Sequence, residues 1–119
     1  MLAEVDTARS QGQLERAVEL LRQILREYPN DPRAPLAAFT LGRVLLNELG
    51  RPREAAAAFH TVREKGPSGQ FAEDALAREV EAWSRASEPE RARALASAYL
   101  EQYPAGRHAR RVKALAGLD

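Results

Sequence analysis

Two residues one helical turn apart, His60 and Glu64, form the first pair that could carry chemistry. On a helix, a His–Glu pair at i and i+4 lies on one face and could supply two ligands to a metal ion. No second histidine and no aspartate lies near the pair in the sequence, so such a site would lack ligands. We therefore expect the pair to lie on a solvated helix face, and we expect no metal site.

Two pairs of carboxylates, Glu79 with Glu81 and Glu88 with Glu90, are spaced two residues apart. At this spacing side chains on a helix diverge, so neither pair is placed to act as general acid and base. The sequence has no cysteine, no G-x-x-x-x-G-K phosphate loop and no G-x-S-x-G nucleophile motif. We expect no catalytic residue and no cofactor, and therefore a protein that is not an enzyme.

The most basic stretch lies near the end of the chain and comprises Arg107, His108, Arg110, Arg111 and Lys113. Such a cluster could contact nucleic acid or acidic lipid, but no aromatic residues alternate with the charges to stack on bases. A terminal helix of a repeat array needs a polar outer face for solubility. We interpret the stretch as a solvated cap.

The composition favours helices as the elements that carry these residues. The 119 residues include 23 Ala and 15 Leu, against 10 Val, Ile and Thr together, whereas strands prefer the β-branched types. A formal net charge of +1 gives no global field toward nucleic acid or an anionic membrane. No apolar run approaches the roughly 20 residues of a membrane-spanning helix, and the N-terminus lacks the pattern of a signal peptide. We expect no nucleic acid partner and no direct membrane insertion.

Three segments repeat five positions at offsets of 38 and then 37 residues. A period between 20 and 50 residues indicates a solenoid or array. Within each copy an alanine precedes two apolar residues by four and seven positions, on one helix face. The three sets are Gly12, Ala17, Leu21, Ile24 and Pro29; Gly50, Ala55, Phe59, Val62 and Pro67; and Ser87, Ala92, Ala96, Tyr99 and Pro104.

Start and stop signals delimit the helices. Gly12 and Gly50 fall where the chain turns between helices, and the three repeated prolines should end the second helix of each pair. Asp31 before Pro32 predicts an N-cap, and Ser87 with Glu90 predicts a capping box. Expected helices cover about 2–10, 13–28, 33–49, 52–65, 70–85, 89–103 and 107–117.

In the expected helices at 33–49 and 70–85, we expect the large apolar residues to face inward. In the terminal helix, Val112, Leu115 and Ala116 should share one side and cover the end of the stack. The inward-facing residues of the first two helices are Leu36, Phe39, Leu41, Val44, Leu45, Leu46 and Leu49, and then Phe71, Leu76, Val80 and Trp83.

The set of repeated residues resembles the tetratricopeptide repeat (TPR). Its second-helix pattern appears as Gly50, Pro52, Ala55, Phe59, Val62 and Pro67, and Leu41–Gly42 matches the L-G pair of its first helix. The resemblance implies an all-α, right-handed α-solenoid of about three helix pairs with a C-terminal capping helix. One domain would span 1–119, with repeats at about 1–30, 31–68 and 69–105 and the cap at about 107–117. The first helix is short, as if its copy began upstream of Met1 or were frayed.

In this family the first helices of successive pairs line a concave groove that binds a peptide or another protein. Mapped onto this sequence, the groove would be formed by Asp6, Arg9, Ser10, Arg43, Asn47, Glu81 and Arg85. The Lys/Asn set that binds a chaperone's C-terminal carboxylate in some members is absent. Arginines at these positions could pair with carboxylates of a partner. A structural role in homo-oligomerisation, in which a second copy covers apolar helix surface, remains the alternative.

A narrower resemblance rests on phrases such as REYPNDPRAPLAAFTLGRVL and YLEQYPAGRHARRV. They are similar in style to bacterial envelope TPR proteins, such as the periplasmic coordinator of the Tol–Pal system and the lipoprotein of outer-membrane β-barrel assembly. They also resemble C-terminal repeats of membrane-bound sigma-factor regulators. The resemblance implies a module of a larger bacterial envelope or signalling protein, in the periplasm or alternatively in the cytoplasm.

Overall fold

The computed structural model describes residues 2–118, which contain seven α-helices, one π-helix and no strand. The expectation of an all-helical fold is therefore confirmed. The ends of the expected domain, residues 1 and 119, lie outside the described part. The elements are α1 (Leu2–Ser10), α2 (Leu14–Glu27), α3 (Ala34–Arg43), the π-helix η1 (Val44–Glu48), α4 (Pro52–Lys65), α5 (Ala72–Arg85), α6 (Pro89–Gln102) and α7 (Ala109–Ala116).

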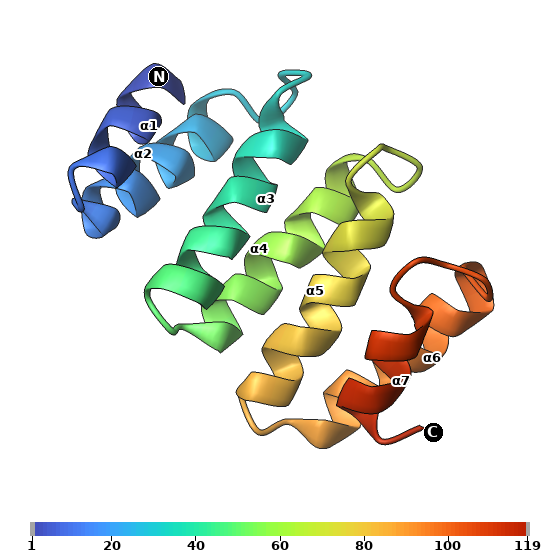
Figure 1. Ribbon diagram of the computed structural model, residues 1–119. Helices are drawn as coiled ribbons and strands as arrows, with labels where there is room; N and C mark the ends of the chain where they lie inside the picture. Colours follow the sequence, from blue (N-terminus) through green and yellow to red (C-terminus); the bar gives the residue numbers. More distant parts are fainter. Residues whose placement is uncertain (1, 119) are drawn as a thin grey trace.

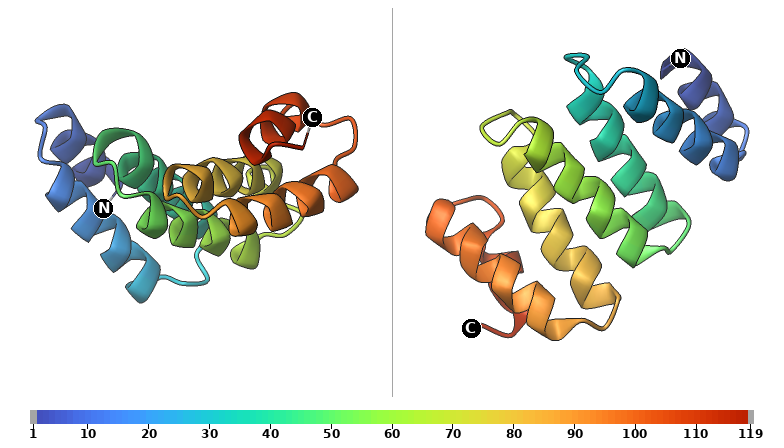
Figure 2. Two further views of the ribbon diagram at one scale, coloured as in Figure 1. Left: turned by 90° about the horizontal axis from the view of Figure 1, so that it is seen from below. Right: turned by 180° about the vertical axis from the view of Figure 1, so that it is seen from behind.

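Consecutive helices pack against each other in antiparallel pairs, and the pairs stack into an α-solenoid (Figure 1). Helices α1, α3, α5 and α7 follow one side of the stack, which we call the inner face. Helices α2, α4 and α6 follow the other side, which we call the outer face (Figure 2, left). Helix α7 contacts both α5 and α6, so it occupies the place of the first helix of a further pair.

The repeated apolar positions form the core. All nine of them on α2, α4 and α6 are buried, from Ala17 on α2 to Tyr99 on α6. The core divides into a cluster that extends from α1 to α5 and a cluster that extends from α5 to α7, and Trp83 packs against both. Val112 and Ala116 of α7 are buried in the second cluster, as expected, and Leu115 is half-buried. Leu36 is the exception among the residues expected to face inward, because 40% of it is exposed.

The turns between the helices of each pair use the left-handed backbone region. Gly12 and Gly50 have φ values of 73° and 62°, which confirms the role expected for these glycines. Ser87 takes the equivalent position in the third pair with φ 59°. The expected capping box at Ser87 is therefore wrong, because the N-cap of α6 is Glu88 and no side chain caps that helix.

The expected N-cap at Asp31 is also wrong. Helix α3 begins at Ala34 with Arg33 as its N-cap, and no side chain caps it. The Asp31 carboxylate instead accepts hydrogen bonds within the preceding loop, from the backbone N–H of Arg33 at 2.8 Å and from its Nε at 3.1 Å. A short polar side chain that bonds to the backbone two residues on stabilises a turn rather than a helix start.

The helix expected at 33–49 ends in a π-helical turn. Leu49 N donates to Val44 O, five residues back, and Arg51 N donates to Leu45 O, six residues back. At the end of α5 the corresponding bonds are one residue shorter, from Ala86 N to Ala82 O and from Glu88 N to Trp83 O. The second pair thus holds one extra residue, and the π turn absorbs it. This insertion explains why buried residues of α3 match those of α5 at an offset of 38, whereas the turns match at 37.

Candidate functional site

A hollow on the inner face lies between η1, α5 and the segment that contains α7. We call it the inner hollow; its volume is about 360 Å³. Glu81 is the acidic residue that lines it, and only 5% of this residue is exposed. The residues that line it are Asn47, Ala77, Arg78, Glu81, Arg85, His108, Arg111, Val112 and Leu115.

Three arginines surround the buried carboxylate of Glu81. Arg85 Nη2 lies 2.6 Å from Glu81 Oε2, Arg111 Nη2 lies 3.5 Å from the same oxygen, and Arg78 Nη1 lies 3.8 Å from Oε1. The arginine side chains are 49%, 62% and 38% exposed in that order, so they keep guanidinium N–H groups open to solvent. One carboxylate cannot balance three guanidinium groups, and the inner hollow therefore carries an excess of positive charge.

Of the seven residues expected to line a groove, the inner hollow brings together Asn47, Glu81 and Arg85. Arg43 lies one helical turn before Asn47 and is exposed. Among the described residues no carboxylate pairs with Arg43, so its charge is free to meet a partner.

The three expected groove residues of α1 do not line this hollow. Asp6 and Ser10 are exposed, and the Ser10 hydroxyl donates to the backbone oxygen of Thr7. Arg9 reaches across to Glu48 of η1, with its Nη2 2.9 Å from Glu48 Oε1. This ion pair joins the first and second helix pairs, so the charge of Arg9 is already balanced within the protein.

Helix α7 is tied to α5 by a polar cluster. His108 Nε2 lies 2.6 Å from Asp74 Oδ1, and Arg107 Nη2 donates to the same oxygen at 2.8 Å. Burial opposes the ionisation of Asp74, but the hydrogen bonds from His108 and Arg107 outweigh it and hold the pKa of Asp74 below its ordinary value. The expectation that the whole basic stretch is a solvated cap is therefore only partly right, because Arg107 and His108 anchor it.

Tyr99 also stabilises the junction between α5 and α7. It is fully buried, and its hydroxyl donates to Glu73 Oε2 at 2.8 Å while accepting the backbone N–H of His108 at 3.0 Å. Burial and the hydrogen bond to Glu73 raise the pKa of Tyr99 to about 12. The phenol therefore stays neutral and holds the start of α7 in place at physiological pH.

Arg78, His108 and Arg111 line the inner hollow but were not expected there. Arg111 and His108 belong to the basic stretch, whose charge was visible in the sequence. Treating the terminal helix as the first helix of another pair would have placed Arg111 on the inner face. Arg78 gave no signal, because a single arginine on an amphipathic helix is ordinary.

Glu79 points to the outer face, so the two carboxylates expected to diverge do so. Glu79 is 3% exposed, and its Oε1 accepts a hydrogen bond from Arg63 Nε at 2.6 Å. Burial raises the pKa of Glu79 above its ordinary value, and the bond from Arg63 offsets only part of this effect. His60 is exposed, and its Nε2 lies 3.7 Å from Glu64, as expected for a solvated pair.

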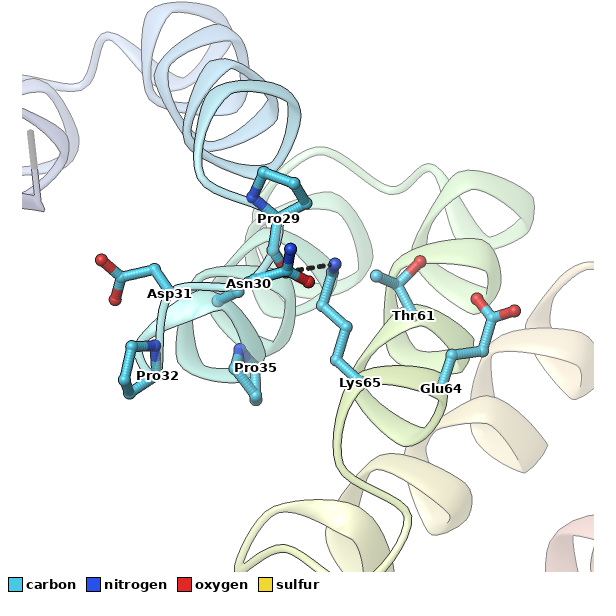
Figure 3. Close-up of a pocket in the computed structure, with 9 residues that line it drawn as sticks. Pro29, Asn30, Asp31, Pro32, Pro35, Thr61, Glu64 and Lys65 are labelled. Atoms are coloured by element: carbon cyan, nitrogen blue, oxygen red, sulfur yellow. Dashed lines mark hydrogen bonds between the residues drawn. The ribbon is translucent and has the colours of Figure 1, made fainter.

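A larger hollow, of about 690 Å³, lies between the α2–α3 loop and the end of α4 (Figure 3). Three prolines, Pro29, Pro32 and Pro35, face Thr61, Glu64 and Lys65 across it. Lys65 Nζ donates to the backbone oxygen of Pro29 at 2.7 Å. This bond ties the loop to α4, which gives the contact a structural role.

Within residues 2–118, no group of three or more His, Asp or Glu side chains is arranged to hold a metal ion. In the same part of the chain, no helix is both long and apolar enough to cross a bilayer.

A family model of the tetratricopeptide repeat matches residues 2–69, which is more than half of the chain. The chain therefore belongs to the tetratricopeptide repeat family. Repeats of this family generally mediate protein–protein interaction and typically act as non-catalytic scaffolds. No curated protein matches the chain.

Proposed function

We propose that the protein is a non-catalytic interaction module whose inner face binds an acidic segment of another protein. The observation that carries the proposal is the inner hollow, where Arg78, Arg85 and Arg111 share one buried carboxylate. Arginine forms paired hydrogen bonds with carboxylates, so the remaining N–H groups suit Asp or Glu side chains of a partner. Arg43 and Asn47 extend the binding surface along the second pair.

Glu81 has a second role in this proposal, because it competes with the carboxylates of the partner for the same arginines. Its side chain is 6% exposed, whereas the arginines around it stay accessible. Replacing Glu81 by Gln would remove the competitor without leaving a buried cation, since each arginine can turn to solvent. We therefore expect Glu81→Gln to strengthen binding of an acidic segment by roughly 2- to 5-fold, the range of an exposed charge pair.

The proposal is tested by capturing proteins from a lysate of the source cells and quantifying them by mass spectrometry. Wild type is compared with the double variant Arg43→Glu/Arg85→Glu and with the milder Arg43→Gln/Arg85→Gln, whose circular dichroism should match wild type. The control is Arg16→Glu/Arg26→Glu, which makes the same charge change on two exposed arginines of α2. The proposal is supported if both inner-face variants lose capture while the α2 control still captures as wild type does. Equal capture by all four proteins rejects it.

Self-association is the alternative function, and light scattering over a range of concentrations separates the two. A monomer whose capture depends on Arg43 and Arg85 supports the interaction module. A dimer that captures nothing would move the assignment to self-assembly. The style of the Tyr–Pro turns supports placing the module in a larger bacterial envelope or signalling protein, in the periplasm.

A further inference from the structure

The outer face carries a second hollow, of about 410 Å³, that the proposed function does not use. We call it the outer hollow. Ala57 of α4 and Ala94 of α6 are exposed on its walls, and Trp83 of α5 lies between these helices and lines it. Small side chains on both walls leave the space between α4 and α6 unfilled. The volume falls in the range of clefts that accept a ligand or an anchoring side chain.

Trp83 makes this hollow distinct from the rest of the outer face. It is the one tryptophan of the sequence, it is half-buried, and its neighbours belong to both core clusters. The guanidinium carbon of Arg91 lies 4.6 Å from the centroid of its ring. A partly open tryptophan covered by an arginine combines an apolar surface with a cation, as at the centres of many protein interfaces.

The charges around the outer hollow favour an acidic partner. The basic side chains that line it are His60, Arg63 and Arg91, and the acidic one is Glu79. Glu79 is buried and bonded to Arg63 at 2.6 Å, and His60 lies near Glu64 at the rim. No carboxylate of the described residues pairs with Arg91, so its charge remains uncompensated beside the apolar surface.

We propose that the outer hollow docks a segment of a second protein that carries a large apolar side chain with an Asp or Glu within one helical turn. The apolar side chain lies against Ala57, Ala94 and Trp83, and the carboxylate pairs with Arg91. This site is separate from the inner hollow, which faces the opposite side of α5 and contains arginines around Glu81. The protein thus presents two docking surfaces on opposite faces of one helix stack.

The test is selection from a phage library of random twelve-residue peptides against the full chain, followed by titration of the enriched peptides as synthetic, tryptophan-free versions. Emission from Trp83 reports binding at the outer hollow. Arg91→Glu reverses the unpaired positive charge beside the outer hollow. Ala94→Glu places a larger side chain on the wall of the hollow, with the same negative charge as the Asp or Glu of the peptide. Matched controls are Arg26→Glu on α2 and Ala114→Glu on α7, which are exposed helical positions outside the hollow.

The expected peptides combine a large apolar residue with nearby Asp or Glu, shift the emission of Trp83, and bind at least about fivefold more weakly to both outer-hollow variants than to both controls. Arg43→Glu/Arg85→Glu should leave their affinity unchanged, which separates this site from the inner face. Enrichment of no peptide, or peptides that bind all variants equally, overturns the proposal. A concentration-dependent dimer that Ala94→Glu dissociates would also overturn it, because the occupant would then be a second copy.

Discussion

At the scale of single residues, Glu79 and Glu81 lie two positions apart but occupy different environments. Glu79 points to the outer face and pairs with Arg63, whereas Glu81 points to the inner face among three arginines. Their divergence follows from helical geometry and was predictable from the spacing alone. Their burial was not, because it depends on how α4 and α7 pack against α5.

The raised pKa of Glu79 predicts a pH dependence of stability. A carboxyl whose folded-state pKa lies above its unfolded value of about 4.5 stabilises the fold most below that value. This contribution is lost as the pH rises from about 4.5 through the raised pKa. Urea unfolding at pH 4 and pH 7 should show wild type losing stability relative to Glu79→Gln. A relative gain for wild type at pH 7 would show that Arg63 lowers the pKa instead.

Ser87 predicts a stabilising substitution. The left-handed backbone region destabilises the folded state by about 1–2 kcal/mol for a non-glycine residue. Glycine avoids this cost, but its greater conformational freedom in the unfolded chain offsets about 0.5–1 kcal/mol of the gain. Ser87→Gly should therefore raise the free energy of unfolding by about 0.5–1 kcal/mol in urea titrations. Ser97→Gly, at an exposed position inside α6, is the matched control and should lower it. The prediction fails if both variants change stability in the same direction.

At the scale of the elements, the helix ranges expected from apolar spacing, glycine and proline agree with the structure to within a few residues at each end. The start signals were less reliable, and both expected side-chain caps are absent. Asp31 and Ser87 each have a turn conformation available that competes with capping, and local sequence does not decide between them. The π turn was not predicted either, although the change of the repeat offset from 38 to 37 residues reflects the extra residue that it contains.

The π turn predicts an asymmetric response to deletions. Removing Asn47 deletes the extra residue and lets the helix run into Gly50 with ordinary α-helical bonds, so the flanking residues keep their register. We expect this deletion to cost at most about 1–2 kcal/mol in urea unfolding. Deleting Ser84, at the corresponding place in α5, rotates the residues that follow by about 100°. That variant should lose most of its cooperative transition, and equal tolerance of the two deletions would contradict this account.

At the scale of the whole molecule, helix pairs position arginines on one face and a tryptophan on the other. The fold class was predictable, and so was the set of helices on the inner face, because the repeat fixes which helix of each pair faces inward. The particular hollow was not, since it needs α7 to supply Arg111 and His108 beside α5. Tertiary contacts such as that between Asp74 and His108 join residues 34 positions apart, and no local sequence pattern predicts them.

The most direct test of the central claim is the dissociation constant of the captured acidic segment, measured by calorimetry for wild type and matched variants. Arg43→Glu/Arg85→Glu should bind it at least about tenfold more weakly, because two attractive pairs become repulsive. Arg16→Glu/Arg26→Glu should stay within about twofold of wild type, since those residues lie on the outer face and act only through screened long-range charge. Equal affinity of the inner-face variant and wild type would contradict the assignment of the inner face as the binding surface.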